Sequence, residues 1–293
     1  MMEGALAMAV EARLGRAVRA SRSVAGGDIN AAYSAELSDG RRVFVKTHPR
    51  APGNMFAVEA RGLSWLREAG ALRIPEVLAV SDGTEVGPKF LVLEYVEPAA
   101  KARDFDELLG RGLAALHRVG APSFGLDHDN FIGSLEQRND TRQDWATFYR
   151  ENRLQFQLRR ASEKRLVSAS LGRDFDRLFE RLETLVGPPE PPARLHGDLW
   201  GGNLHVDERG QPCLIDPAVY GGHREVDLAM MRLFGGFGRR VFDAYHEAWP
   251  LAPGHEARVS LYQLYPLLVH VNLFGGGYVG SVTRAIAGAL ADG

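Results

Sequence analysis

The polar residues best suited to chemistry lie between Leu195 and Asp216, in a segment rich in glycine and apolar residues. Asp198, Asn203 and Asp216 are the candidates. The apolar run 213–215 precedes Asp216, as it would at the end of a buried strand. In phosphoryl transfer one carboxylate orients the attacking hydroxyl, while a carboxamide and a second carboxylate hold Mg²⁺ on the phosphates of ATP. We therefore predict that Asp198 is catalytic and that Asn203 and Asp216 bind the metal.

The spacing of these residues supports this prediction. Asn203 follows Asp198 by five residues, as in the catalytic loop of protein kinases. Asp216 follows 13 residues later, which leaves room for one hairpin with its turn at residues 207–210. The alternative is a polar loop in which Asp and Asn only cap turns.

A lysine and a glutamate upstream predict a phosphate clamp. Lys46 comes late in an expected strand, 41–47, and Glu59 lies on the apolar stripe of an expected helix, 55–69. Burial of an unpaired carboxylate is costly, so Glu59 needs a partner, and Lys46 is the obvious one. Such a pair, with the lysine reaching ATP phosphates, is the kinase arrangement. The alternative is that Glu59 reaches solvent at the edge of the stripe.

The N-terminal part predicts a small β-rich lobe. A helix is expected over about 3–20, then a glycine-rich turn with Gly26 and Gly27 that leads into a hairpin. Glycine lets a backbone approach phosphates closely, although an ordinary turn is an equal alternative. Further strands are expected at 75–80 and 90–96. We expect the lobe to end at residue 96, with backbone groups near Glu94 and Val96 taking the adenine edge.

After residue 97 the pattern becomes helical. Helices are expected from about 104, across 142–170, around 175–182 and across 258–274. The last is apolar nearly all round, which indicates burial. His270 and Asn272 stand out in it as candidate substrate contacts, although a lone histidine there is more often a core residue. Asp227 either caps a helix or braces the catalytic loop.

Composition narrows the classes of function. The 293 residues are 45% hydrophobic and 25% charged, with a net charge of −2 and no block of like charges, so no nucleic-acid footprint is indicated. No apolar run is long enough for a membrane span. Cys213 is the only cysteine, which excludes an intrachain disulfide and a cysteine metal cluster. We expect a cytoplasmic protein.

Taken together, these motifs resemble the fructosamine kinase (ketosamine-3-kinase) family, which is similar in fold to aminoglycoside phosphotransferases and, more distantly, to protein kinases. The matching pieces span most of the chain; they are residues 26–30, 44–46, 196–203, 215–218, 222–225, 233–237 and 261–270. Gly201 stands where the family usually has Ser. Asp28 stands where some members carry a cysteine, so a disulfide-linked redox switch is not expected.

The resemblance implies an α+β, bilobal protein-kinase-like fold, with an ATP-binding lobe at 1–96 and a larger helical lobe at 97–293. It implies ATP- and Mg²⁺-dependent phosphorylation of a sugar hydroxyl on a ketosamine, either a small molecule or a glycated lysine on a protein, leading to deglycation. Trp200, beside Asp198, could offer its face to the sugar or simply pack under the loop.

Three alternatives stay open. The chain could be a kinase for an aminoglycoside, choline or homoserine, although the segment 262–278 argues against this. It could be a non-catalytic ATP-binding regulator, although intact Lys46, Asp198, Asn203 and Asp216 argue against this. It could also be a purely structural scaffold, which absence of nucleotide-induced thermal stabilisation would indicate. The sequence leaves the oligomeric state open.

Overall fold

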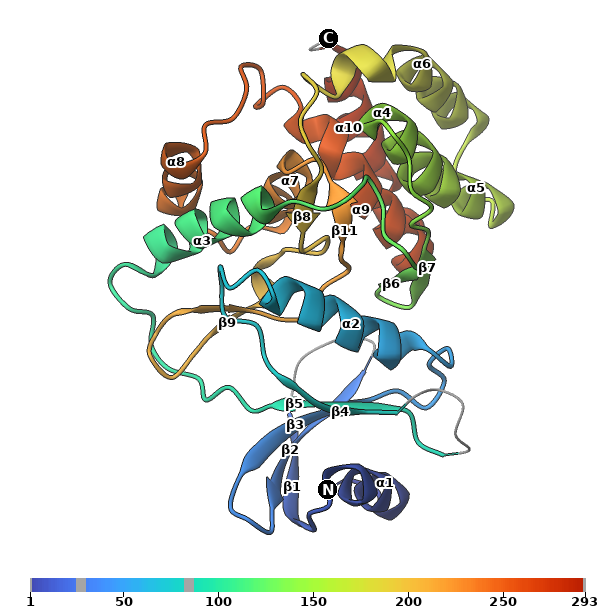
Figure 1. Cartoon of the computed structure of the whole chain (residues 1–293). Coiled ribbons are helices and arrows are strands. Elements are labelled where there is room, and N and C mark those ends of the chain that lie inside the picture. Colours follow the sequence, from blue (N-terminus) through green and yellow to red (C-terminus); the bar gives the residue numbers. More distant parts are fainter. Residues whose placement is uncertain (1, 25–29, 82–86, 292–293) are drawn as a thin grey trace. The chain divides into compact units, whose positions relative to one another are not determined.

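The computed structural model describes residues 2–24, 30–81 and 87–291, and the chain divides into two compact units (Figure 1). The first unit comprises Met1–Arg103 and His205–Asp216, and the second comprises Asp104–Leu204 and Pro217–Gly293. The expected lobes, 1–96 and 97–293, differ from these units mainly in the segment 205–216. We keep the two lobes as a proposal for the division of function.

The first unit is built on a five-stranded antiparallel sheet of order β1-β2-β3-β5-β4. Its elements are α1 (Gly4–Leu14), β1 (Val18–Val24), β2 (Ala31–Leu37), β3 (Arg42–Thr47), α2 (Met55–Arg67), β4 (Val77–Val80) and β5 (Phe90–Glu94). Figure 1 shows α1 and α2 on opposite faces of this sheet. Alternate residues of a strand face opposite sides, so Val43 and Val45 pack in the core with α1 while Lys46 faces the other way.

The N-terminal helix is shorter than expected, and the prediction of a helix to residue 20 is wrong. The helix ends at Leu14 because Gly15 adopts a left-handed conformation, with φ of 63°, and its N–H bonds the Glu11 carbonyl. From Val18 the backbone instead pairs with β2. The four-residue spacing of apolar residues continued past the glycine by coincidence, so periodicity alone missed the boundary.

The hairpin of β9 (Leu204–Val206) and β10 (Pro212–Leu214) forms with its turn at the predicted place. Arg73 anchors the segment, because its guanidinium bonds Glu208 at 2.8 Å and Glu94, at the end of β5, at 2.6 Å. His205 Nε2 lies 3.2 Å from the Val96 carbonyl. These contacts explain why this segment belongs with the first unit. Cys213 is fully buried in β10.

The second unit is mostly helical. Its helices are α3 (Phe105–Val119), α4 (Trp145–Phe148), the π-helix η1 (Tyr149–Gln155), α5 (Phe156–Glu163), α6 (Ala169–Leu185), the 3₁₀ turn η2 (Gly201–Asn203), α7 (Glu225–Phe234), α8 (Arg239–Ala248), α9 (Val259–Phe274), η3 (Gly276–Tyr278) and α10 (Val279–Ala291). Two short antiparallel pairs complete it: β6 (Asn130–Ile132) with β7 (Leu135–Gln137), and β8 (Ala193–Leu195) with β11 (Tyr220–Gly222).

The centre of the second unit is α9, as its apolar sequence predicted. It contacts α10, α7 and α5, and most of its side chains are buried in one core. The helix expected across 142–170 is interrupted, however. It runs from Trp145 to Glu163 through the π-helix, and a new helix begins at Ala169 after the positive φ of Arg165. Within the described ranges, no helix combines the length and the apolar character needed to cross a membrane.

Substituting alanine for each of two helical glycines should change the free energy of unfolding in opposite directions. In α3, a Cβ on Gly110 would lie 2.2 Å from the Val241 carbonyl oxygen of α8, whereas a Cβ on Gly172 of α6 meets nothing within 4 Å. Gly110→Ala should therefore lower the free energy of unfolding by about 1–3 kcal/mol through overpacking. Gly172→Ala should raise it by about 0.5–1 kcal/mol through helix propensity. Denaturant titration of both variants tests this, and equal effects would contradict the close packing of α3 on α8.

Candidate active site

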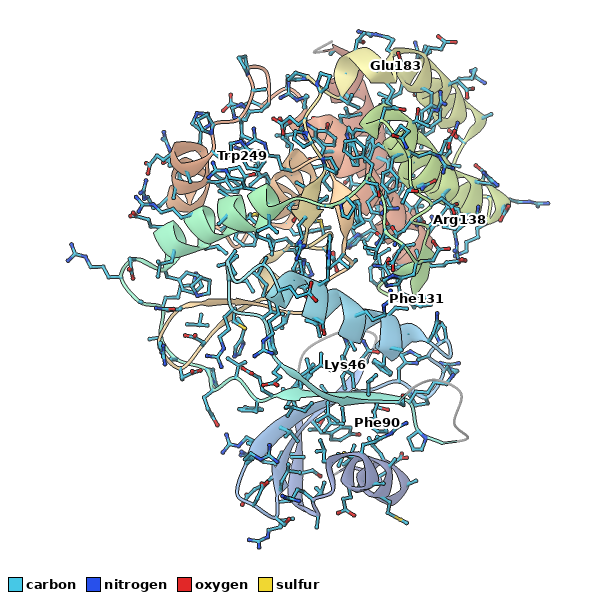
Figure 2. The ribbon with its side chains drawn as sticks, in the orientation of Figure 1. Lys46, Phe90, Phe131, Arg138, Glu183 and Trp249 are labelled. Carbon is cyan, nitrogen blue, oxygen red and sulfur yellow. The ribbon has the colours of Figure 1, made fainter. Side chains whose placement is uncertain are left out.

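The first cluster of candidate residues surrounds Lys46. Its ammonium donates to Glu59 Oε1 at 2.8 Å and to Asp216 Oδ1 at 3.0 Å. Figure 2 shows Lys46 between the sheet and α2, the helix that carries Glu59. The side chains of Lys46 and Glu59 are only 8% and 10% exposed. The predicted contact between them is therefore present, and the alternative of a solvated Glu59 is wrong.

Electrostatics keep this lysine charged. Burial alone would lower the pKa of Lys46, but the carboxylates of Asp216 and Glu59 more than offset it, so the pKa of Lys46 is raised. Burial raises the pKa of Glu59, and Lys46 opposes that effect. A charged ammonium held by two carboxylates is a fixed positive group, suited to meet an anion such as a phosphate.

Asp216 is placed by an unusual backbone conformation. It follows β10 and Ile215, and its φ is 52°, in the left-handed region that Asp tolerates better than most residues. Its side chain is 40% exposed, so only part of the carboxylate is occupied by the lysine contact. A hard oxygen ligand at the end of a buried strand matches the predicted metal role, which stays a prediction.

The second cluster lies in the second unit, on the loop after β8. Asn203 donates through Nδ2 to the Asp198 backbone carbonyl at 2.8 Å and to Asp198 Oδ2 at 3.2 Å. Because the amide nitrogen is turned to Asp198, the atom of Asn203 suited to a cation is its carbonyl oxygen. The expected pairing of base and carboxamide is thus a direct contact.

Asp227, on α7, braces this loop, which settles the choice left open by the sequence. Its carboxylate accepts from the backbone N–H of His196 at 2.8 Å and of Gly197 at 2.9 Å. His117 Nε2, on α3, donates to the same carboxylate at 3.1 Å, and His117 Nδ1 lies 2.8 Å from Tyr245 Oη on α8. Burial raises the pKa of Asp227, but His117 and the backbone donors more than offset it, so the pKa is lowered.

The loop also needs the glycine at position 197. Its φ is 83°, and a Cβ there would lie 2.0 Å from the Ala218 carbonyl oxygen. Any other residue would suffer left-handed strain and a clash together. The turn between His196 and Asp198 is therefore fixed on one side by Asp227 and on the other by a close backbone approach.

Trp200 follows Asp198 by two residues and is 42% exposed. Its ring folds over Gly202, where a Cβ would lie 2.2 Å from a ring atom, and it meets Phe234 edge-on at 6.5 Å between centroids. Phe234 in turn packs on His270 at 4.6 Å. The structure therefore links two of the three predicted substrate residues, Trp200 and His270, through Phe234 and leaves Trp200 partly exposed.

Asn272 is placed differently. It is buried, and its amide nitrogen donates at 2.9 Å to both the carbonyl and the side chain of Gln157 on α5. It lies about half a turn of α9 from His270, because two residues correspond to roughly 200°. The prediction that Asn272 contacts substrate finds no support in this geometry, and we do not carry it into the proposed site.

At the expected end of the first lobe, two backbone groups already have hydrogen-bond partners. The Glu94 N–H bonds the Glu76 carbonyl at 2.9 Å, and the Val96 carbonyl is near His205 Nε2. The Glu94 carbonyl and the Val96 N–H are the two groups that those bonds leave for an adenine edge. The carboxylate of Glu94 is held by Arg73. Gly26 and Gly27 lie outside the described residues.

Sequence reasoning missed several residues around these clusters. His117 sits on the buried face of the amphipathic helix α3 with no motif around it, so nothing marked it as the partner of Asp227. Phe234 and Phe274 carried a signal, because each is the second residue of a Leu-Phe-Gly-Gly segment, at 233–236 and 273–276. A repeat at the ends of two helices points to a shared surface.

Comparisons with known proteins agree with this geometry. A family model described as Fructosamine kinase matches residues 2–292. A relative from Enterococcus faecium, named "Probable ketoamine kinase", is 38% identical over 90% of this chain and 92% of its own length. "Protein-ribulosamine 3-kinase, chloroplastic" from Oryza sativa is also 38% identical, over 90% of this chain and 77% of its own length.

Comparison with solved structures identifies the fold. A "putative fructosamine-3-kinase" from Thermobifida fusca superposes with a TM-score of 0.91 at 39% identity, covering 99% of this chain and 100% of that one. Choline kinase LicA from Streptococcus pneumoniae shares the fold, with a TM-score of 0.64 at 18% identity over 98% of both chains. The predicted α+β, protein-kinase-like fold is confirmed.

The Lys46–Glu59 pair gives a prediction independent of any substrate. Lys46→Met leaves the Glu59 carboxylate buried without its partner and should lower the free energy of unfolding by about 2–4 kcal/mol. Adding Glu59→Gln to the Lys46→Met variant should lower the free energy of unfolding by less than Glu59→Gln does in the wild type. The difference, which is the coupling free energy of the two residues, should be about 1–2 kcal/mol. Denaturant titration of both single variants and the double variant measures that coupling. Strictly additive effects would mean that the two groups do not act as a pair.

Proposed function

Because this chain belongs to the fructosamine kinase family, we propose that it transfers the γ-phosphoryl group of ATP to a sugar hydroxyl of a ketosamine. The observation that carries the proposal is the Asp198–Asn203 pair, held on a braced loop in a chain that matches the family from residue 2 to residue 292. The relatives named ketoamine kinase and ribulosamine 3-kinase support the substrate class.

Asp198 is the group that meets the acceptor. Its carboxylate accepts the hydrogen bond of the sugar hydroxyl and orients the oxygen lone pair toward phosphorus. Because the transition state is loose, this positioning matters more than full removal of the proton. Asp227, through the backbone of His196 and Gly197, keeps Asp198 in place. Trp200 offers the sugar ring a flat apolar wall.

Lys46 and Glu59 form the proposed phosphate clamp. Lys46 neutralises charge on the phosphates, and Glu59 keeps its ammonium in position. The carbonyl of Glu94 and the N–H of Val96 would take the adenine edge.

The donor set also fits Mg²⁺. The carbonyl oxygen of Asn203 and the carboxylate of Asp216 are hard oxygen ligands, and Mg²⁺ typically takes only one or two protein ligands besides phosphates and water. When bound, the ion would offset the charge that develops between the β- and γ-phosphates. Asp216 would then divide its two oxygens between Lys46 and the metal.

The rival functions have less support. The fold shared with choline kinase at 18% identity shows no more than the fold, whereas the relatives at 38% identity carry ketoamine names. A non-catalytic regulator would have no use for the Asp198–Asn203 contact. Phosphorylation of ketosamines would destabilise the sugar–amine adduct and so lead to deglycation. We also propose a cytoplasmic location, on the grounds of the single cysteine.

The catalytic role of Asp198 gives a kinetic prediction. Asp198→Asn retains the size and the contact with Asn203 but loses the negative charge that orients the hydroxyl. It should lower kcat by about 10²–10⁴, or roughly 3–5 kcal/mol of barrier, while ATP still binds. Steady-state kinetics and nucleotide-induced thermal stabilisation measure the two effects. A variant with near-normal kcat would refute the role.

The substrate is tested with a panel. We expect ATP- and Mg²⁺-dependent turnover of ribulosyl-lysine and fructosyl-lysine, with kcat/KM above that for kanamycin, choline and homoserine. The reason is that polar groups built to bind a sugar hydroxyl reject acceptors that leave them unpaired, by up to about 10⁴-fold. If one of the three other acceptors exceeds both ketosamines by about tenfold, or 1.4 kcal/mol, the chain is a kinase with a different substrate.

A further inference from the structure

An exposed aromatic cluster continues outward from Trp200. It consists of Trp200, Phe234, His270, Phe274 and Tyr278, and every ring contacts at least one other at 4.6–6.5 Å between centroids. Trp200, Phe234 and Phe274 are 42%, 37% and 51% exposed, and they are three of the five large apolar side chains exposed among the described residues. Gathered exposed apolar side chains of this kind mark binding surfaces.

The cluster is built by two parallel helices that end together. Gln263 of α9 donates to the Ala229 carbonyl of α7, and five residues further along α7 Phe234 packs on His270 of α9. Both helices therefore run in the same direction. Each ends with Phe as its last residue, followed by a glycine with positive φ, Gly235 or Gly275. The two Leu-Phe-Gly-Gly segments thus place their rings on one surface of the second unit.

The chemistry of this surface suits an alkylammonium group. None of its five members carries a fixed charge, and burial lowers the pKa of His270, so that ring is neutral near pH 7. His270 Nδ1 lies 2.8 Å from the Pro266 carbonyl, to which it must donate, so Nε2 carries a lone pair. Ring faces attract cations and pack against methylene groups, and the lone pair accepts an N–H.

The position of the cluster indicates which part of the substrate it meets. Trp200 follows Asp198 by two residues on the same loop, and under the proposed function its ring lies against the sugar whose hydroxyl Asp198 orients. The amine of a ketosamine is attached to the sugar and, when protonated, is a secondary ammonium on an alkyl chain. We propose that Phe234, His270, Phe274 and Tyr278 bind the amine-bearing portion of the substrate, namely the side chain of a glycated lysine within a peptide or protein.

This inference rests on the proposed function and makes Phe234 and Phe274 determinants of specificity. Residues that contact only the amine substituent should discriminate between ketosamines that share one sugar. A ribulosyl group on methylamine would reach Asp198 and Trp200 but not the outer rings. A ribulosyl group on the lysine of a short peptide would reach both, and the ratio of the two kcat/KM values reports the contribution of the cluster.

The experiment measures that ratio for the wild type, Phe234→Ala/Phe274→Ala and Phe274→Leu. We expect the wild type to prefer the peptide, and the double variant to lose about tenfold or more of that preference, as for removal of aromatic anchors. Phe274→Leu keeps apolar area but loses the ring face, and should lose about threefold. Met8→Ala, at a side chain 70% exposed on α1, is the matched control and should leave the ratio unchanged.

The outcomes separate the two proposals. Melting temperature and the KM for ATP, measured on each variant, report whether it is folded. A wild type without preference, or a double variant that loses activity equally on both substrates, overturns the binding site while the kinase activity stands. A wild type that phosphorylates neither ribulosamine overturns the proposed function, and this inference with it.

Discussion

The second unit depends on one buried carboxylate. Asp227 is fully buried, and an isolated charge there would be strongly destabilising. It is stabilised by three donors, two from the consecutive backbone N–H groups of His196 and Gly197 and one from His117. These bonds tie two different parts of the chain, namely the loop after β8 and α3, to the start of α7. The geometry of Asp198 is therefore a consequence of satisfying Asp227.

The first unit also contains a buried charged group, the ammonium of Lys46, but its partners are different. Lys46 is buried with two carboxylates rather than with neutral donors, so the cluster carries a formal excess of negative charge. The Mg²⁺ ion of the proposed function would balance that excess. The two units thus each contain a charged group whose burial is compensated locally, and each group holds one predicted functional residue in place.

The sequence allowed prediction of the parts in which a local pattern and a tertiary requirement coincide. Alternation in β3 and the apolar stripe of α2 led to the Lys46–Glu59 contact, and the turn residues led to the hairpin before Asp216. The end of α1 was missed because Gly15 interrupts a spacing that continues beyond it. Asn272 was predicted to contact substrate, whereas it bonds Gln157. A polar residue in an apolar helix indicates that it has a hydrogen-bond partner, but the sequence does not show where that partner lies. Gln157, more than 100 residues earlier, could not be identified from the pattern.

The burial of Cys213 has a consequence for how this protein meets oxidants. The thiol has no solvent exposure, and burial raises its pKa to about 12, so the reactive thiolate is almost absent at neutral pH. As this is the only cysteine in the sequence, the folded chain presents no reactive thiolate to peroxide or to a disulfide. Its catalytic rate should therefore not vary with the glutathione redox state. A thiol reagent should modify Cys213 only in molecules in which β10 has locally unfolded, so the extent of labelling reports that opening.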